Sequence, residues 1–265
     1  MNENFTSLLF FTILSQMAVG TLIFRELILL RGWFEFISYQ FRKRSLHVIV
    51  ILLFLSLVIA FLHLGNPLHA FNAIKNFGKS WLSREIFSLS LLMAALLLYL
   101  IIVLRNNHLR TERIISFISV MLCISFVYSM IKLYMIPSVI SWNNPFTPVS
   151  FIITTFLCGL ILLAVIIWKN FDGFNYIIAL LTAILVICSL ANSILFYGTF
   201  LKQVYYLFII RTALSIISLL IITVLNFRFQ SNKTGIWWVI LSLIVVVSEI
   251  INRYIFFLSF EKSGL

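Results

Sequence analysis

Charged residues are scarce in this sequence. They make up 10% of its 265 residues, whereas hydrophobic residues make up 62% and the mean hydropathy is +1.12. Soluble domains carry about 25% charged residues, because a surface that faces water needs them. The composition therefore excludes an ordinary soluble domain and predicts an integral, multi-pass membrane protein.

Cysteine is scarce as well, and its three positions share one pattern. Cys123, Cys158 and Cys188 each lie alone in an apolar run, without a CxxC spacing and without a histidine nearby in the sequence. Disulfide frameworks and zinc sites require paired or clustered cysteines. We therefore predict that these cysteines are small core residues and that this chain binds no metal.

Acidic residues are the rarer charge, with eight Asp and Glu against nineteen Lys and Arg and a net charge of +11. A basic balance of this kind raises the question of nucleic-acid binding. The basic residues fall mostly in short connectors, however, and they form no long exposed tract. We predict no nucleic-acid partner, and membrane topology explains the charge better.

Eight apolar runs are long enough to cross a bilayer. A hydrocarbon core of about 30 Å needs roughly 20 helical residues, because unpaired backbone amides are too costly there. The sequence thus predicts an all-α integral membrane protein, one transmembrane domain over residues 1–265 with two four-helix bundles formed by spans one to four and five to eight. The predicted spans are Leu8–Phe24, Leu46–Leu64, Ile86–Leu104, Ile114–Met135, Val149–Trp168, Asn175–Phe196, Leu207–Leu225 and Ile236–Leu258.

The first run is expected to remain as a spanning helix. It begins within MNENFTSLLFF, where an acidic residue replaces the basic segment that opens a cleaved signal peptide. Basic residues then set the orientation, because positive loops stay in the cytoplasm. Both termini are therefore predicted to lie outside, since eleven of the nineteen basic residues fall in odd-numbered connectors: Arg25, Arg31, Arg42, Lys43, Arg44, Arg105, Arg110, Arg113, Lys169, Arg228 and Lys233.

Ionisable groups at membrane depth are the most informative residues, because each is costly there and is usually kept for a task. In the predicted topology seven polar groups from five helices gather in the outer leaflet. Glu249 precedes Arg253 by four residues, and this helical spacing favours an ion pair. The adjacent Arg25 and Glu26 face different directions, and we predict that they are interfacial anchors. The seven groups are His63, Glu85, Lys132, Tyr134, Arg211, Glu249 and Arg253.

His63 and Glu85 differ in kind from the other groups. They end the second span and open the third at the same face, so the two side chains are expected to meet. An imidazole and a carboxylate at the headgroup boundary can exchange protons with water while they touch a molecule dissolved in the acyl region. The pair therefore suits a lipid-soluble molecule that releases protons.

The stretch that contains this pair resembles a known signature. HLGNPLHAFNAIKNFGKSWLSREI, residues 63–86, is similar to the membrane-anchor subunit of anaerobic dimethyl sulfoxide reductase, in its histidine with Leu-Gly, its x-Pro pair, its Ala-Phe-Asn and its Leu-Ser-x-Glu-Ile. Weaker similarities occur in register in LSQMAVG, FTPVSFIITTF and SEIINRYIFF. The resemblance runs along the whole chain, which is nevertheless shorter than this family leads us to expect in its C-terminal outer connectors.

The resemblance implies the anchor of a heterotrimeric respiratory complex in the cytoplasmic membrane. A molybdopterin catalytic subunit and an iron-sulfur electron-transfer subunit would dock on this chain. The chain would bind menaquinol and oxidise it during anaerobic respiration, and the terminal acceptor would be reduced in another polypeptide. The family's functional histidine and glutamate map to His63 and Glu85, which are the catalytic candidates. Further quinol-binding candidates are Tyr134, Arg211, Glu249 and Arg253, and the expected partner-docking residues are Lys75, Lys79 and Arg84.

Haem is not expected in this chain. Cytochrome b-type quinol oxidoreductases hold haem between paired histidines on spanning helices. Only His63 lies at membrane depth here, and only at its edge. Electrons from a quinol would therefore leave through a cofactor in another subunit.

Two alternatives stay open. An eight-helix secondary transporter would show spans interrupted by glycine or proline at paired positions. A polysulfide- or nitrite-reductase-type quinone anchor would change only the final electron acceptor. Against the transporter, the four prolines all fall in predicted outer connectors, at Pro67, Pro137, Pro145 and Pro148.

Overall fold

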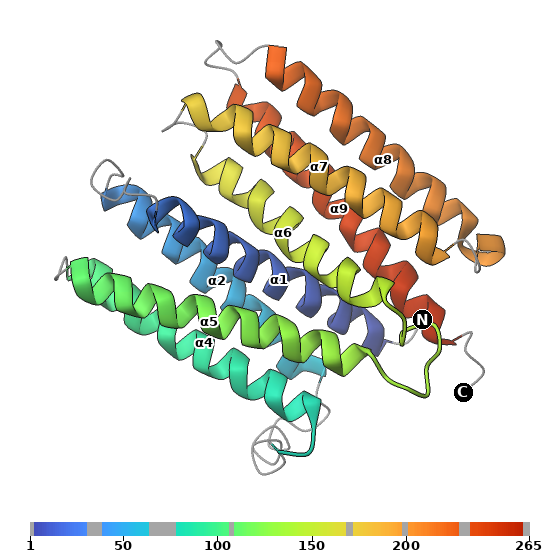
Figure 1. Cartoon of the computed structure of the whole chain (residues 1–265), viewed down its shortest axis with the longest axis horizontal. Coiled ribbons are helices and arrows are strands. Elements are labelled where there is room, and N and C mark those ends of the chain that lie inside the picture. Colours follow the sequence, from blue (N-terminus) through green and yellow to red (C-terminus); the bar gives the residue numbers. More distant parts are fainter. Residues whose placement is uncertain are drawn as a thin grey trace. The chain divides into compact units, whose positions relative to one another are not determined.

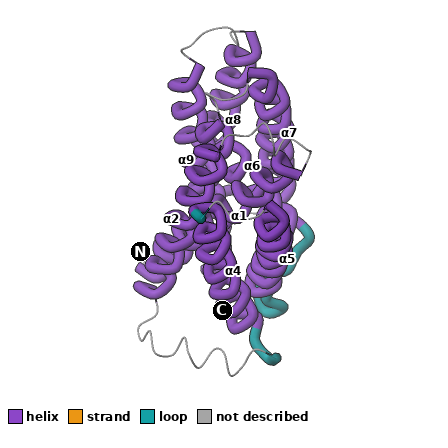
Figure 2. Tube along the Cα trace, turned by 90° about the vertical axis from the view of Figure 1, so that its left-hand side faces the viewer, coloured by secondary structure: helices purple, strands orange, loops and turns teal. Residues whose placement is uncertain are grey.

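Long helices make up nearly all of the part of the chain that the structure describes. The computed structural model describes residues 3–30, 39–63, 78–105, 109–167, 172–197, 201–227 and 234–261. Figures 1 and 2 show the long helices that these ranges contain. The helices are α1 (Glu3–Leu30), α2 (Tyr39–His63), α4 (Trp81–Leu104), α5 (Leu109–Tyr134), α6 (Phe146–Ile167), α7 (Asp172–Tyr197), α8 (Leu201–Phe227) and α9 (Thr234–Glu261).

The prediction of an all-α protein with eight spans is confirmed. Each of the eight helices contains a segment that is long and apolar enough to cross a membrane, and the described residues include no strand. The main difference lies at the helix ends. The first helix continues to Leu30 and the second begins at Tyr39, because polar residues that were expected at the interface are helical and buried.

The chain divides into two compact units of four helices each. Unit 1 covers Met1–Ile136 and holds α1, α2, α4 and α5, whereas unit 2 covers Pro137–Leu265 and holds α6 to α9. In unit 1 the neighbouring pairs are α1 with α2, α2 with α4, α4 with α5 and α1 with α5. In unit 2 they are α6 with α7, α7 with α8, α8 with α9 and α6 with α9. Each unit is therefore a closed ring of four helices, as the division of the spans into two groups of four predicted.

One ion pair connects all four helices of unit 1. The Arg25 guanidinium pairs with Glu26 and donates to Ser45 Oγ of α2 at 2.7 Å. The Glu26 carboxylate accepts hydrogen bonds from the Tyr99 hydroxyl of α4 at 3.2 Å and from Ser116 Oγ of α5 at 2.5 Å. The interpretation of Arg25 and Glu26 as interfacial anchors is therefore wrong, because both side chains are fully buried among helices.

The reason lies in the reach of the two side chains. Adjacent positions leave a helix in different directions, but an arginine and a glutamate are long enough to turn toward each other. Pairing and hydrogen bonding then offset the large cost of burying each charge. A second ion pair, between Arg42 of α2 and Glu112 of α5 at 2.7 Å, lies near the same end of the unit.

The segment that leads into α6 is fixed to the end of α9. Trp142 donates from Nε1 to the Phe256 carbonyl oxygen at 3.0 Å, and its ring stacks on the Phe256 ring with centroids 4.9 Å apart. Asn144 Oδ1 accepts from the backbone amides of Phe146 and Thr147 and so caps α6. Pro148, which was predicted in a connector, lies in the first turn of α6, where a missing amide hydrogen does little harm.

The prediction that all three cysteines are core residues is correct for two of them. Cys123 and Cys158 are buried, whereas Cys188 of α7 is exposed. A helix in a membrane presents apolar residues to lipid as well as to its neighbours. Hydrophobicity alone therefore does not tell the two faces apart.

Replacing Arg25 with methionine is expected to destabilise unit 1 strongly. The change leaves the Glu26 carboxylate buried without its cation, which typically costs about 3–5 kcal/mol. The free energy of unfolding of the detergent-solubilised chain, measured by titration with a denaturing detergent, tests this. Arg110→Met, at an exposed position of α5, is the control, and equal losses in the two variants would show that the pair contributes nothing.

Candidate functional site

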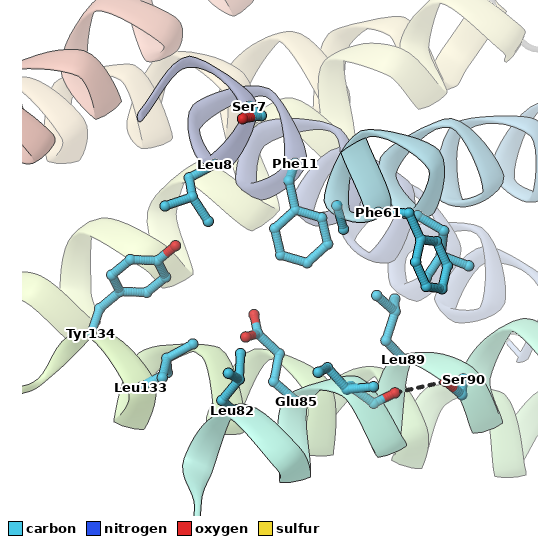
Figure 3. A pocket seen from close by; sticks show the side chains of 13 residues that line it. Ser7, Leu8, Phe11, Phe61, Leu82, Glu85, Leu89, Ser90, Leu133 and Tyr134 are labelled. Carbon is cyan, nitrogen blue, oxygen red and sulfur yellow. Dashed lines mark hydrogen bonds between the residues drawn. The ribbon is translucent and has the colours of Figure 1, made fainter. Parts of the chain in front are cut away.

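Unit 1 contains a cavity of about 400 Å³ that all four of its helices line (Figure 3). It lies where the N-terminal parts of α1 and α4 meet the C-terminal parts of α2 and α5, which is the predicted outer end of the unit. Its walls are largely apolar. The lining residues are Ser7, Leu8, Phe11, Leu57, Ala60, Phe61, Leu82, Glu85, Ile86, Leu89, Ser90, Leu133 and Tyr134.

Among the described residues, Glu85 is the only acidic one in that lining. It lies on the second turn of α4, it is 3% exposed, and its carboxylate points into the cavity (Figure 3). Its Oε1 has no hydrogen-bond partner among the residues that the structure describes. Burying an unpaired carboxylate is costly. The energetic cost and the direction of the side chain both favour a group that acts on a ligand.

Tyr134 lines the same cavity from the end of α5. It is 5% exposed, and its hydroxyl points toward the cavity, as does the carboxylate of Glu85 (Figure 3). Ser90, also in the lining, donates to the Ile86 carbonyl oxygen of its own helix at 2.8 Å. The structure therefore brings two predicted site residues, Glu85 and Tyr134, into one cavity.

His63 is the last residue of α2, which lines the cavity with Leu57, Ala60 and Phe61. The side chain of His63 lies outside the described residues, and so does Lys75 with the rest of residues 64–77. The expected meeting of His63 and Glu85 thus stays a prediction.

The two other predicted docking residues lie at the start of α4. Lys79 is exposed in a turn just before the helix. The Arg84 guanidinium lies 4.2 Å from the centroid of the Trp81 ring and donates to the Gly78 carbonyl oxygen at 2.9 Å. These contacts hold Arg84 beside its own helix, and a docking role for the two residues stays a prediction.

Unit 2 has its own buried polar cluster, centred on Glu249. This carboxylate accepts hydrogen bonds from Thr154 Oγ1 of α6 and Ser189 Oγ of α7, both at 2.7 Å. Its ion pair is with Arg211 of α8, at 3.6 Å. Each of the other three helices of the unit thus bonds to this one group on α9.

The predicted ion pair within α9 is therefore wrong. Glu249 pairs with Arg211, and the Arg253 guanidinium lies instead over the Phe151 ring, 3.7 Å from its centroid. Arg211 reaches Glu249 from a neighbouring helix, and it is fixed there by its own bonds to the Ser189 carbonyl and hydroxyl oxygens. Helical spacing identifies a possible partner on the same helix but gives no information on a competitor from another.

Other parts of the cavity were not predicted at all. Phe11, Phe61 and Leu89 form its walls, but each is one apolar residue among many in a long apolar run. Ser7 was missed for a similar reason, since single serines are frequent in these spans. Within the described ranges, no three histidine, cysteine, aspartate or glutamate side chains gather as a metal-ligand group.

Comparison with known proteins identifies the family. The protein matches the family described as DMSO reductase anchor subunit (DmsC) over residues 1–258. It belongs to this family. The predicted resemblance is thereby confirmed along the whole chain. DmsC proteins are membrane-anchor subunits of dimethyl sulfoxide reductase, which agrees with the eight apolar helices of this multi-pass protein.

The curated relatives are also subunits of anaerobic dimethyl sulfoxide reductases. The YnfH subunit of an anaerobic dimethyl sulfoxide reductase of Escherichia coli K12 is 30% identical over 202 residues, which are 75% of this protein and 70% of that subunit. The C subunit of anaerobic dimethyl sulfoxide reductase is 32% identical over 156 residues in Haemophilus influenzae and 29% identical over 154 residues in E. coli K12. These matches cover 58% and 57% of this protein and only 56% and 54% of the two C subunits.

A double-mutant cycle is expected to show coupling between Arg211 and Glu249. The variants Arg211→Met, Glu249→Gln and their combination should give a coupling free energy of about 1–3 kcal/mol, because the two groups are buried and in contact. The measurement is the free energy of unfolding of the full-length protein in detergent. The same cycle with Arg253→Met is the comparison, and a larger coupling there would contradict the assigned ion pair.

Proposed function

We propose that this protein anchors a dimethyl sulfoxide reductase-type molybdoenzyme complex in the cytoplasmic membrane and oxidises menaquinol there. In this proposal the unit 1 cavity binds the quinol and Glu85 takes part in removing its protons. The observation that carries the proposal is a buried carboxylate, directed into an apolar cavity of a DmsC family member, with one oxygen that has no partner among the described residues.

The cavity has the chemistry that a quinol head group requires. Its volume of about 400 Å³ lies within the range of small-molecule sites, which are mostly apolar with a few polar groups that fix orientation. Phe11, Phe61 and Leu89 offer flat and aliphatic surface to an aromatic ring. Glu85 and Tyr134 supply the polar groups, directed into the same space. An isoprenoid tail suits the surrounding lipid.

Oxidation of a quinol to a quinone releases two protons and two electrons. The Glu85 carboxylate accepts a hydrogen bond from one quinol hydroxyl and then takes its proton. Tyr134 binds the other oxygen of the head group. His63, three residues after Ala60 in α2, passes this proton to water at the predicted outer face, and Glu85 then takes the second proton, which leaves by the same route.

The two electrons leave through a partner subunit. An iron-sulfur cluster in that subunit would accept them one at a time and pass them to the molybdopterin catalytic subunit, where the terminal acceptor is reduced. Lys75 and Lys79, with the neighbouring Arg84, form the electropositive region on which we expect the iron-sulfur subunit to dock. This connector joins α2 to α4, so a subunit docked there lies close to the mouth of the cavity.

The prediction that Arg211, Glu249 and Arg253 bind quinol is separate from the unit 1 cavity, because these residues belong to unit 2. Arg211 Nε and Nη1 find no hydrogen-bond acceptor among the described residues, so two donors stay available for a ligand or for water. The bonds of Glu249 to three helices also give it a structural task that is independent of a quinol.

Glu85→Gln and His63→Ala are each expected to reduce menaquinol-linked reduction by the assembled complex about 100-fold or more, a typical contribution of general acid-base catalysis. Reduction driven by a soluble dye that bypasses the anchor should stay at the wild-type rate. Both rates are measured on the same purified complex.

Ser90→Ala is the matched control, since Ser90 lines the cavity but bonds to its own helix. It should leave both rates unchanged. Wild-type menaquinol oxidation in both Glu85→Gln and His63→Ala would end the site assignment.

Ala60→Trp is expected to block the cavity without removing any ionisable group. The indole would occupy the space of the head group, so menaquinol-linked activity should fall at least tenfold. The dye-linked rate should stay unchanged, because weaker binding of the quinol affects only the quinol reaction. Ala94→Trp, at an exposed position of α4, controls for the bulk of the side chain. Full quinol oxidation in Ala60→Trp would place the site elsewhere.

A further inference from the structure

A second cavity lies between α4 and α5 of unit 1. Its volume is about 290 Å³, and α4 contributes Trp81, Arg84, Phe87, Ser88 and Leu91, while α5 contributes Leu122, Ser125, Tyr128 and Ser129. Glu85 and Tyr134 do not belong to this lining, so the groove is distinct from the proposed quinol cavity. We name it the α4–α5 groove.

The groove is open on the side that faces away from the helix core. Phe87, Leu91 and Tyr128 are all more than one-third exposed, although they belong to helices that are apolar enough to span a membrane. Lipid therefore has direct access to the groove. The part of the groove farther from the start of α4, with Leu91 and Leu122, is apolar and suits an acyl chain.

The end of the groove near the start of α4 has the residues of the interface between lipid and water. Trp81 and Tyr128 pack edge to face with ring centroids 5.8 Å apart, and these two residue types are enriched at the level of lipid head groups. An amphipathic ring there has one side in the acyl region and its polar atom near water. These residue types therefore predict that this end of the groove lies at the level of the phospholipid phosphates.

Positive charge gathers at that end. The Arg84 guanidinium lies over the Trp81 ring and lines the groove. Lys132 lies one turn beyond Tyr128 on α5, with its Nζ 5.8 Å from the Tyr128 ring centroid, and it forms no ion pair with a described carboxylate. The first backbone amides of α4 add the positive end of a helix dipole. The described residues that line the groove include no acidic one.

We infer that the α4–α5 groove binds an anionic phospholipid. Its phosphate lies between Arg84 and Lys132 at the start of α4, and one acyl chain follows Leu91 and Leu122 between the two helices. A zwitterionic lipid carries a cation next to its phosphate, which two basic side chains disfavour. Arg84 then belongs both to the lipid site and to the proposed docking region, whereas Lys75 and Lys79 serve the partner subunit alone.

Native mass spectrometry of the full-length protein in its complex tests the assignment. The complex is purified in detergent with equal amounts of phosphatidylglycerol and phosphatidylcholine, and the retained lipids are counted. Wild type should retain phosphatidylglycerol in preference. The variant Arg84→Gln with Lys132→Gln should retain about 30-fold less, since each basic group near a membrane surface contributes about 1 kcal/mol and the variant removes two.

The control makes the same change of charge at the opposite ends of the same two helices. Arg105→Gln with Arg110→Gln, both at exposed positions, should retain phosphatidylglycerol as wild type does. Retention by the Arg84 and Lys132 variant at the wild-type level would overturn the inference, and so would an equal loss in the control.

A groove-filling variant and competition with inorganic phosphate give two further tests of the lipid site. If the Arg84 and Lys132 variant does not assemble, Ser125→Trp replaces it, because an indole there fills the groove and leaves both charges in place. Loss of phosphatidylglycerol from Ser125→Trp supports the lipid site, and retention overturns it. Inorganic phosphate added to wild type should displace no lipid, and displacement would show a site for a free anion instead.

Discussion

In each half of this protein one buried ion pair bonds all four helices together, and this is the constraint on which the rest of the unit depends. Glu26 and its neighbour Arg25 reach the other three helices of unit 1, and Glu249 reaches those of unit 2. Apolar side chains give helices little reason to prefer one another over lipid, whereas a charge in hydrocarbon must find its partners inside the protein. Packing of the apolar faces then follows the arrangement that these bonds select.

Glu85 differs from those two carboxylates in its hydrogen bonds to the described residues. All three are buried in spanning helices, yet Glu26 and Glu249 accept bonds from several helices, and Glu85 has an oxygen without a partner among the described residues, beside an apolar cavity. A satisfied buried charge stabilises a fold, while an unsatisfied one destabilises it unless a ligand completes it. A buried glutamate can therefore have a structural role or a ligand-binding role, and its local hydrogen bonds distinguish the two.

Two cavities of unit 1 lie at the same end of its four helices. The proposed quinol cavity lies inside the ring, and the α4–α5 groove lies on its outer side. The first turns of α4 contribute to both, with Glu85 facing the cavity and Arg84 facing the groove. Membership in a family of reductase anchors and the direction of Glu85 into an apolar cavity both support the proposal that this end of unit 1 oxidises a lipid-soluble donor.

The sequence by itself determined the eight helices and the residue at the centre of the proposed site. Runs of apolar residues suffice to predict the helices, because a helix in a bilayer forms all its backbone hydrogen bonds internally. The signature around Glu85 suffices to select that residue. Only the tertiary structure decided which charges pair. The adjacent Arg25 and Glu26 form a buried link, Glu249 pairs with Arg211 and not with Arg253, and Cys188 faces outward. These outcomes depend on which helices are neighbours and how each is rotated, and hydrophobic runs carry little information on either.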